Sequence, residues 1–292
     1  MTQAPAMPAL AASLPRRDRT AAWLLLPAAV LLIAFLAVPL CATVWASLSP
    51  NDIVRFQGPG LDNYGYVFSK QHYLTVIWRT IRLALLATAV ALLIGYPTAL
   101  ALWRLPPRLN SFMLMGTTFP ILTGPLVVVL GWMILLSNGG PLLAPLAALG
   151  LPVPKILGTE TGISVGIVHF VLPLVILMLN SALRAIPPAL LEASASLGAR
   201  PLSRFVHVIW PLSLPGVLSA LVVAFALSAS SYISPYYLGG AGRHMLGTLV
   251  SEFMLATFNG QLAAVAAMLL LIIKTVAIVG ATLALGRRMR GP

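Results

Sequence analysis

Long apolar stretches dominate this 292-residue chain and limit what it can fold into. A transmembrane helix needs about 20 mostly apolar residues to cross about 30 Å of hydrocarbon, and six stretches qualify. Only 8% of the residues are charged, whereas an ordinary soluble domain has about 25%. The sequence therefore predicts an all-α integral membrane protein with six transmembrane helices, at about Ala21–Leu48, Val76–Trp103, Phe112–Leu136, Gly162–Leu183, Val217–Leu238 and Leu262–Leu285.

Basic residues fall unevenly between the two sides of this predicted bundle, and such a bias sets orientation, because cytoplasmic loops carry the excess of Lys and Arg. With a cytoplasmic N-terminus, eleven basic residues are inside and four are outside, so both termini are predicted to be cytoplasmic. The inside residues are Arg16, Arg17, Arg19, Arg104, Arg108, Arg184, Arg200, Arg204, Arg287, Arg288 and Arg290, and the outside residues are Arg55, Lys70, Lys155 and Arg243.

Several function classes are excluded by what the chain lacks. The formal net charge of +12 is divided among small groups between apolar stretches and forms no continuous patch, so nucleic-acid binding is not expected. No P-loop pattern is present for ATP phosphates, and a single cysteine, Cys41, allows no Cys-based metal site. We therefore expect no catalytic residues, no metal and no cofactor held by this chain.

The predicted cytoplasmic loop 185–216 has a helical pattern of its own. Pro188 suits the first turn of a helix, Glu192 lies early in that helix, and Gly198 suits a left-handed stop, which predicts a short helix from Pro188 to Leu197. Pro201 then begins a second helix, predicted to end at Pro211. The apolar face expected on this second helix comprises Phe205, Val208 and Ile209. A helical hairpin with small side chains and an apolar face is typical of a docking element.

This loop resembles the EAA signature of the permease subunits of ABC importers. The signature runs EAA, three residues, Gly, nine residues, then I-x-L-P, and here it is matched by Glu192, Ala193, Ser194, Gly198 and the run Val208–Pro211. Ser194, Val208 and Trp210 depart from it. The chain also resembles the spermidine/putrescine-type branch of these permeases, which includes opine importers. The segments that carry this resemblance are Asn63–Tyr64, Gly95–Pro97, His169–Pro173, Pro211–Gly216 and Ser234–Gly240.

The resemblance implies a type I ABC importer permease fold with cytoplasmic coupling helices, in a bacterial inner membrane. Residues 1–20 would be a disordered cytoplasmic tail and residues 21–292 a six-span permease domain, with the family core at about 76–285. The implied partners are a second permease subunit, two ATPase subunits that bind the ATP, and an extracytoplasmic solute-binding protein. The implied ATPase-coupling residues are Glu192, Ala193, Ser194, Leu197, Gly198, Ala199 and Pro211.

Polar residues inside the predicted spans are candidates for a solute path. Ser230, Ser231 and Tyr232 make the outer half of the fifth span polar, and Pro235 is predicted to break it. Lys274 lies near the middle of the sixth span, on a stripe of small residues that is expected to face the bundle. Lys274 is either a pore-lining or gate cation, or it snorkels or pairs with the second permease. The serines either line the solute path or form ordinary hydrogen bonds between helices.

The other charged and titratable residues of the spans do not identify the solute. Arg79 and Arg82 lie near the outer start of the second span and are expected to snorkel, and His169 is expected to be a packing residue. A polyamine is a polycation, and a path with Lys274 and no intramembrane acid would repel it. An opine or another amino-acid derivative fits those charges better.

The alternative function is a secondary transporter, although its usual intramembrane acids are absent.

Overall fold

A computed structural model describes residues 19–51, 58–240 and 242–289 of the protein. The predicted disordered tail falls, up to residue 18, outside the described residues. The chain divides into two compact units, residues 1–45 and 46–292. In the first unit the described part belongs to helix α1 (Arg19–Leu48), whose last three residues enter the second unit. Most described side chains of α1 are exposed, Phe35 to 79%, as expected for a helix that faces lipid.

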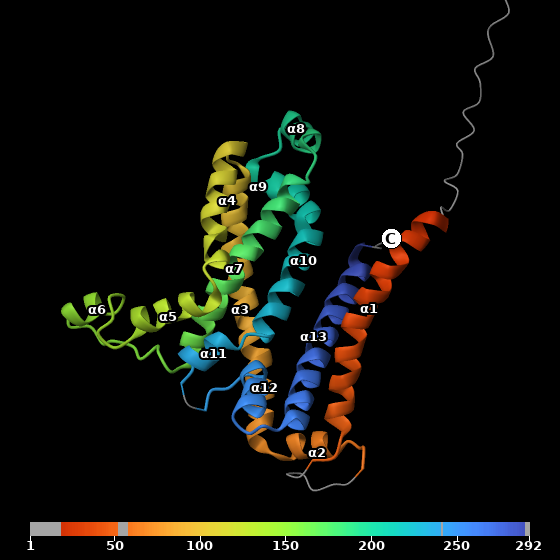
Figure 1. Cartoon of the computed structure of the whole chain (residues 1–292). Helices are drawn as coiled ribbons and strands as arrows, with labels where there is room; N and C mark the ends of the chain where they lie inside the picture. The colour runs from red at the N-terminus through yellow and green to blue at the C-terminus, as the bar shows by residue number, and fades with distance from the viewer. Residues whose placement is uncertain (1–18, 52–57, 241, 290–292) are drawn as a thin grey trace, which may run out of the picture. The chain divides into compact units, whose positions relative to one another are not determined.

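The second unit is built from helices, and among the residues described it has no β-strand. Figure 1 shows α8 at one end of its bundle, which we call the hairpin end, and α2 and α12 at the opposite end. The helices are α2 (Asp62–Ser69), α3 (Gln71–Trp103), α4 (Pro107–Leu122), α5 (Pro125–Leu136), α6 (Ala144–Ala148), α7 (Glu160–Arg184), α8 (Pro188–Ser196), α9 (Pro201–Arg204), the π-helix η1 (Phe205–Ile209), α10 (Trp210–Ala229), α11 (Ile233–Leu238), α12 (Leu246–Leu255) and α13 (Gly260–Met289).

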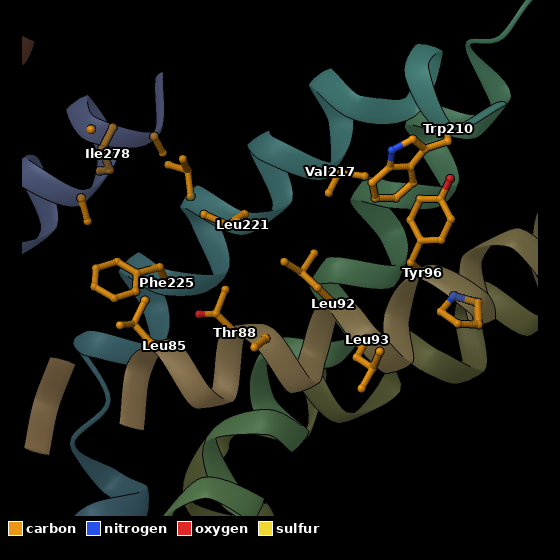
Figure 2. A pocket seen from close by; sticks show the side chains of 16 residues that line it. Leu85, Thr88, Leu92, Leu93, Tyr96, Trp210, Val217, Leu221, Phe225 and Ile278 are labelled. Carbon is orange, nitrogen blue, oxygen red and sulfur yellow. The ribbon is translucent and has the colours of Figure 1, made fainter. Parts of the chain in front are cut away.

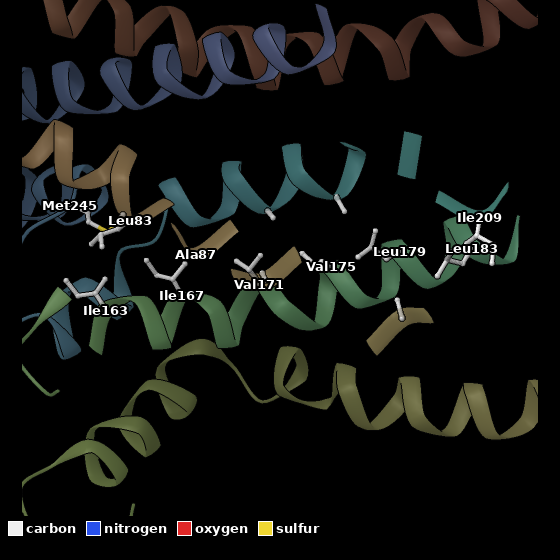
Figure 3. Close-up of a cluster of buried hydrophobic side chains, with 14 of the residues drawn as sticks. Leu83, Ala87, Ile163, Ile167, Val171, Val175, Leu179, Leu183, Ile209 and Met245 are labelled. Carbon is white, nitrogen blue, oxygen red and sulfur yellow. The ribbon is translucent and has the colours of Figure 1, made fainter. Parts of the chain in front are cut away.

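Helices α3, α7 and α10 pack together as the core of this unit (Figure 3). Large buried side chains of α7, among them Ile167 and Leu179, meet small side chains on the neighbouring helices. Gly216 of α10 lies so close to Ala182 of α7 that a Cβ there would collide with the Ala182 methyl group. Small residues let helix backbones approach closely, and in a membrane this packing replaces the hydrophobic effect between helices.

The third predicted span, Phe112–Leu136, is wrong as a single helix. The structure divides it into α4 and α5, which meet at 91° across a break at Thr123 and Gly124. Gly124 has φ +83°, and Pro125 follows it at the start of α5. A glycine in this backbone region followed by a proline ends one helix and begins another. By length and composition, five helices can cross a membrane among the residues described, or six if this bent pair is one span.

The fifth predicted span, Val217–Leu238, is also displaced in the structure. One continuous helical run extends from Pro201 to Ala229, so Pro211 continues the second helix of the loop and does not end it. The π-helix η1 makes this possible. Its wide turn has the Trp210 N–H donating to the Phe205 carbonyl, five residues back, just before the proline that lacks an N–H. The helix then stops at Ala229, before the predicted break at Pro235, which lies within α11.

Buried asparagines join elements that are distant in sequence. Asn110 of α4 and Asn180 of α7 exchange hydrogen bonds of 3.1 and 3.4 Å. At the opposite end, Asn51 and Asn259 exchange bonds of 3.1 and 3.2 Å, and Asn259 Oδ1 also accepts from the Leu262 N–H in the first turn of α13. Buried amides need partners, so these pairs fix where α4 and α13 sit in the second unit.

Candidate functional site

The hairpin of α8 and α9 begins with a helix that ends where the sequence predicts. Helix α8 covers Pro188–Ser196, and Gly198 after it has φ +73°. The Ala199 N–H donates to the Ser194 carbonyl at 3.1 Å, and the Gly198 N–H donates to the Ala195 carbonyl at 2.9 Å. This pair of bonds is the Schellman motif, which satisfies the last carbonyls of a helix and needs a left-handed residue. The predicted glycine stop is confirmed.

One side of the hairpin anchors it to the bundle. Ile209 is buried in the main core cluster, and Phe205 and Leu191 pack against that cluster. The apolar face predicted for the second helix thus packs, at Phe205 and Ile209, against the core of the chain itself. Because the second helix runs straight on into α10, its apolar side faces the core of its own chain rather than a partner.

The other side of the hairpin is open. Glu192, Ala193 and Gly198 are exposed, whereas Ser194 and Ala199 are half-buried. Leu197 is 88% exposed and Leu202 of α9 is 74% exposed. Exposed apolar residues clustered at one tip mark an interaction surface. Of the residues predicted to couple, Pro211 lies apart from this tip, in the first turn of α10.

An aromatic cluster links the base of the hairpin to the core helix α3. Tyr96 of α3 forms a hydrogen bond of 2.9 Å with Ser213 of α10 through its hydroxyl group. Its ring meets Trp210 edge-on at 5.3 Å and Phe205 at 6.1 Å. Trp210, a departure from the EAA pattern, thus has a packing role here. These contacts pack the base of the hairpin directly against α3.

Two of the predicted path residues come together in the membrane region. The Lys274 Nζ of α13 donates to the Ser230 Oγ at 3.1 Å, and Ser230 lies where α10 ends. Ser231 and Tyr232 form the short connection from α10 to α11. A Cβ on Gly247 of α12 would lie 2.8 Å from the Ser231 carbonyl oxygen, so α12 packs directly against this break.

Sequence reasoning missed an ionic cluster formed by Arg79, Arg82 and Glu160. Arg79 Nε donates to the Glu160 Oε1 at 3.0 Å, and Arg82 pairs with the other carboxylate oxygen. Arg79 also donates to the carbonyls of Gly242 and His244. Sequence reasoning expected Arg79 and Arg82 to snorkel, and the structure adds a shared carboxylate partner for both. About 80 residues separate each arginine from Glu160 in the sequence, and no local pattern signals such a pair.

An apolar pocket of about 810 Å³ lies between α3, α10 and α13 (Figure 2). Leu92 and Tyr96 line it from α3, Phe225 from α10 and Ile278 from α13, and no charged side chain is in its lining. Such a lining suits an apolar chain and offers nothing to recognise a charged solute. Elsewhere the His169 ring meets Trp132 edge-on at 5.7 Å, which agrees with a packing role.

Long apolar helices, a bent helix pair and an exposed hairpin at one end are typical of one class, the polytopic membrane transport proteins. The chain belongs to the family described as the inner membrane component of binding-protein-dependent transport systems, whose model matches residues 87–291. Among the described residues, no group of three or more His, Cys, Asp or Glu side chains is placed to hold a metal.

Curated relatives agree with this family. The spermidine/putrescine transport system permease protein PotB of Haemophilus influenzae is 30% identical over 231 residues, which are 77% of this chain and 80% of PotB. The PotB of Escherichia coli K12 is 29% identical over 75% of this chain and 81% of its own length. The molybdenum transport system permease protein ModB of Azotobacter vinelandii is 32% identical over 58% of this chain and 74% of its own length.

Solved structures show the same fold. A chain of a bacterial alginate ABC transporter, in complex with its alginate-bound periplasmic protein, matches with a TM-score of 0.74 and 18% identity, over 94% of this chain and 96% of that one. A chain of the MetNI methionine ABC transporter matches with a TM-score of 0.56 and 21% identity, over 74% of this chain and 94% of that one. The type I ABC importer permease fold is thus confirmed.

The protein is therefore a permease subunit of an ABC importer in the inner membrane, and not an enzyme. A partner ATPase uses the ATP, and a solute-binding protein delivers the solute. Family membership also decides against the secondary transporter, because these systems depend on a binding protein.

Proposed function

We propose that the hairpin of α8 and α9 is the coupling element of this permease, and that it docks on an ATPase subunit in the cytoplasm. The observation that carries the proposal is the division of the hairpin into two sides. Ile209 and Phe205 join it to the core of the bundle, while Glu192 and Leu197 are exposed at its tip. A rigid element fixed at its base and exposed at its tip transmits displacement.

The working unit in this proposal is a pore of two permease subunits with two ATPase subunits beneath it, the second permease being a copy of this chain or a related one. ATP brings the ATPases together, and the docked hairpins move with them. The pore then changes between inward and outward opening, because the ligand favours one of two states. The aromatic contacts from Trp210 to Tyr96 carry this movement into α3.

Orientation in the membrane supports the cytoplasmic placement of the hairpin. Arg184, Arg200 and Arg204 lie in or beside the loop that bears α8, and an excess of basic residues marks the cytoplasmic side. Both termini are then cytoplasmic. We further propose a small organic solute of polyamine, opine or amino-acid-derivative type, which the names of the PotB relatives favour.

Glu192→Ala tests the coupling role. In the complete importer, reconstituted into lipid vesicles, this variant should lose most ATP-driven uptake and bind its ATPase at least about tenfold more weakly, since an exposed docking residue is removed. Membrane insertion should stay normal. Asp62→Ala is the matched control, an exposed acid on α2 at the opposite end of the bundle. Normal uptake by Glu192→Ala would refute the proposal.

A further inference from the structure

A lysine amine lies near the middle of a long apolar helix of the second unit, α13. Helix α13 has 30 residues, and Lys274 follows its first residue, Gly260, by 14 positions. At 1.5 Å per residue this is about 21 Å along the axis from the first residue of the helix. A charge this far along an apolar helix needs a polar partner or water beside it.

The hydrogen bonding of Lys274 leaves part of the amine available. An ammonium group has three donors, and among the residues that the structure describes Lys274 uses one of them, on Ser230 Oγ at 3.1 Å. Ser230 Oγ itself donates to the Ala226 carbonyl at 2.8 Å, so its hydrogen is engaged and its lone pairs face the amine. The serine thus orients Lys274 and does not neutralise it.

No acid compensates this charge within the described part of the chain. Lys274 forms no ion pair there, and the acids Asp62, Glu160, Glu192 and Glu252 lie at the ends of the bundle. Glu160 is already engaged by Arg79 and Arg82. The last-turn carbonyls of α10 favour a cation by their dipole, but they carry no full charge.

The Lys274–Ser230 pair is not fully enclosed by the bundle. Ser230 is exposed and Lys274 is half-buried, so both are open on one side. They lie at the C-terminal end of α10, and a helix that stops at membrane depth does so where its backbone is packed against protein or lines a cavity or a path. A cation placed there attracts an anion and repels a cation.

We propose that Lys274, oriented by Ser230, binds an anionic group of the transported solute, and that the solute carries a carboxylate, phosphate or similar acid group. The inference rests on the proposed function and narrows the class of solute that the permease transports. Among the solutes considered above, an opine or another amino-acid derivative fits, and a polyamine with amines alone does not.

A charge-sensitive labelling experiment tests the site without knowledge of the solute. In a Cys41→Ala background, Ser231→Cys places the only cysteine of the chain beside the Lys274–Ser230 pair. In the reconstituted importer, its rate of reaction is measured with a sulfonate-bearing and a trimethylammonium-bearing methanethiosulfonate reagent. Replacing Lys274 by Met should lower the ratio of anionic to cationic rate at least about fivefold, and Lys274→Arg should retain it.

Two results would overturn the site: a ratio that is the same with Lys274 and Lys274→Met, or no reaction with either reagent in any nucleotide state. A second measurement tests the solute class, by mass spectrometry of the compound that the cognate binding protein retains when isolated from cells. An acid group is expected, and a compound with amines alone would contradict the proposal. Both results are independent of Glu192→Ala, so failure of the anion site is distinguishable from failure of the coupling role.

Discussion

Gly198 shows how a single residue can be required for its backbone rather than for its size. Its φ is +73°, and a Cβ added there would meet nothing within 4 Å. A side chain at this position is therefore strained although it has room. The sequence made this residue predictable, because a glycine that follows a helical pattern with early proline and glutamate is the usual left-handed stop.

We expect Gly198→Ala to weaken the association of the permease with its ATPase about fivefold to tenfold. The left-handed conformation costs an alanine about 1–2 kcal/mol, and relief of that strain shifts the hairpin away from its docking geometry. Gly198→Asn is the control, since asparagine tolerates this region and should bind nearly as well as the parent protein. Equal binding by all three proteins, measured by co-purification at graded ATPase concentration, would contradict this account.

Glu160 gives a second prediction for a single side chain. Glu160→Gln leaves Arg79, whose side chain is only 14% exposed, beside a neutral amide. Because hydrogen bonds to charged groups are worth about 1.5–3 kcal/mol and Glu160 is partly solvated, we expect a loss of about 1–2 kcal/mol of stability. Thermal unfolding of the purified protein measures it. The control, Glu252→Gln, affects a more exposed acid 3.5 Å from His244 and should change stability little; equal losses would argue against a special role for Glu160.

Among the elements, α8 was predictable, whereas the break between α4 and α5 and the continuous helix through Pro211 were not. Phe112–Leu136 is apolar throughout, so hydropathy predicts one span, and the direction taken at Gly124 depends on what α4 and α5 pack against. Pro211 predicts a helix end by its missing N–H. That rule failed because the wide π turn at Phe205–Ile209 lets the helix continue through the proline. The ring of Trp210, which follows this turn, packs against Tyr96. Such contacts between distant residues leave no periodic signal.

The contact between α7 and α10 allows a test at this scale. Gly216→Leu should push α10 away from Ala182 of α7, because even a Cβ at position 216 would collide with the Ala182 methyl group. Overpacking of this kind costs about 1–3 kcal/mol or more, so folded, monodisperse protein in detergent should fall in yield and in unfolding temperature. Gly116→Leu, in α4 with open space around it, is the matched control and should behave like the parent protein. Equal behaviour of the two variants would show that the close approach does not hold the core.

For the whole molecule, the fold class followed from composition and the length of the apolar stretches, because a membrane permits few solutions. Only part of the candidate site could be predicted from the sequence. The positions of Glu192 and Gly198 were readable from local signals, and Ser230 and Lys274 were found separately as polar residues within spans. Their contact across 44 residues, like the pairing of Glu160 with two arginines, needed the structure.

The central claim is that the tip of the hairpin touches an ATPase, and a crosslink at that tip tests it most directly. Leu197, 88% exposed, is replaced by cysteine in the Cys41→Ala background. A short bifunctional reagent is then applied to the assembled importer. The account predicts a covalent product of permease and ATPase that is absent when the cysteine is placed instead at exposed Ser69, on α2 at the opposite end. No capture from position 197, or capture from position 69, would contradict it.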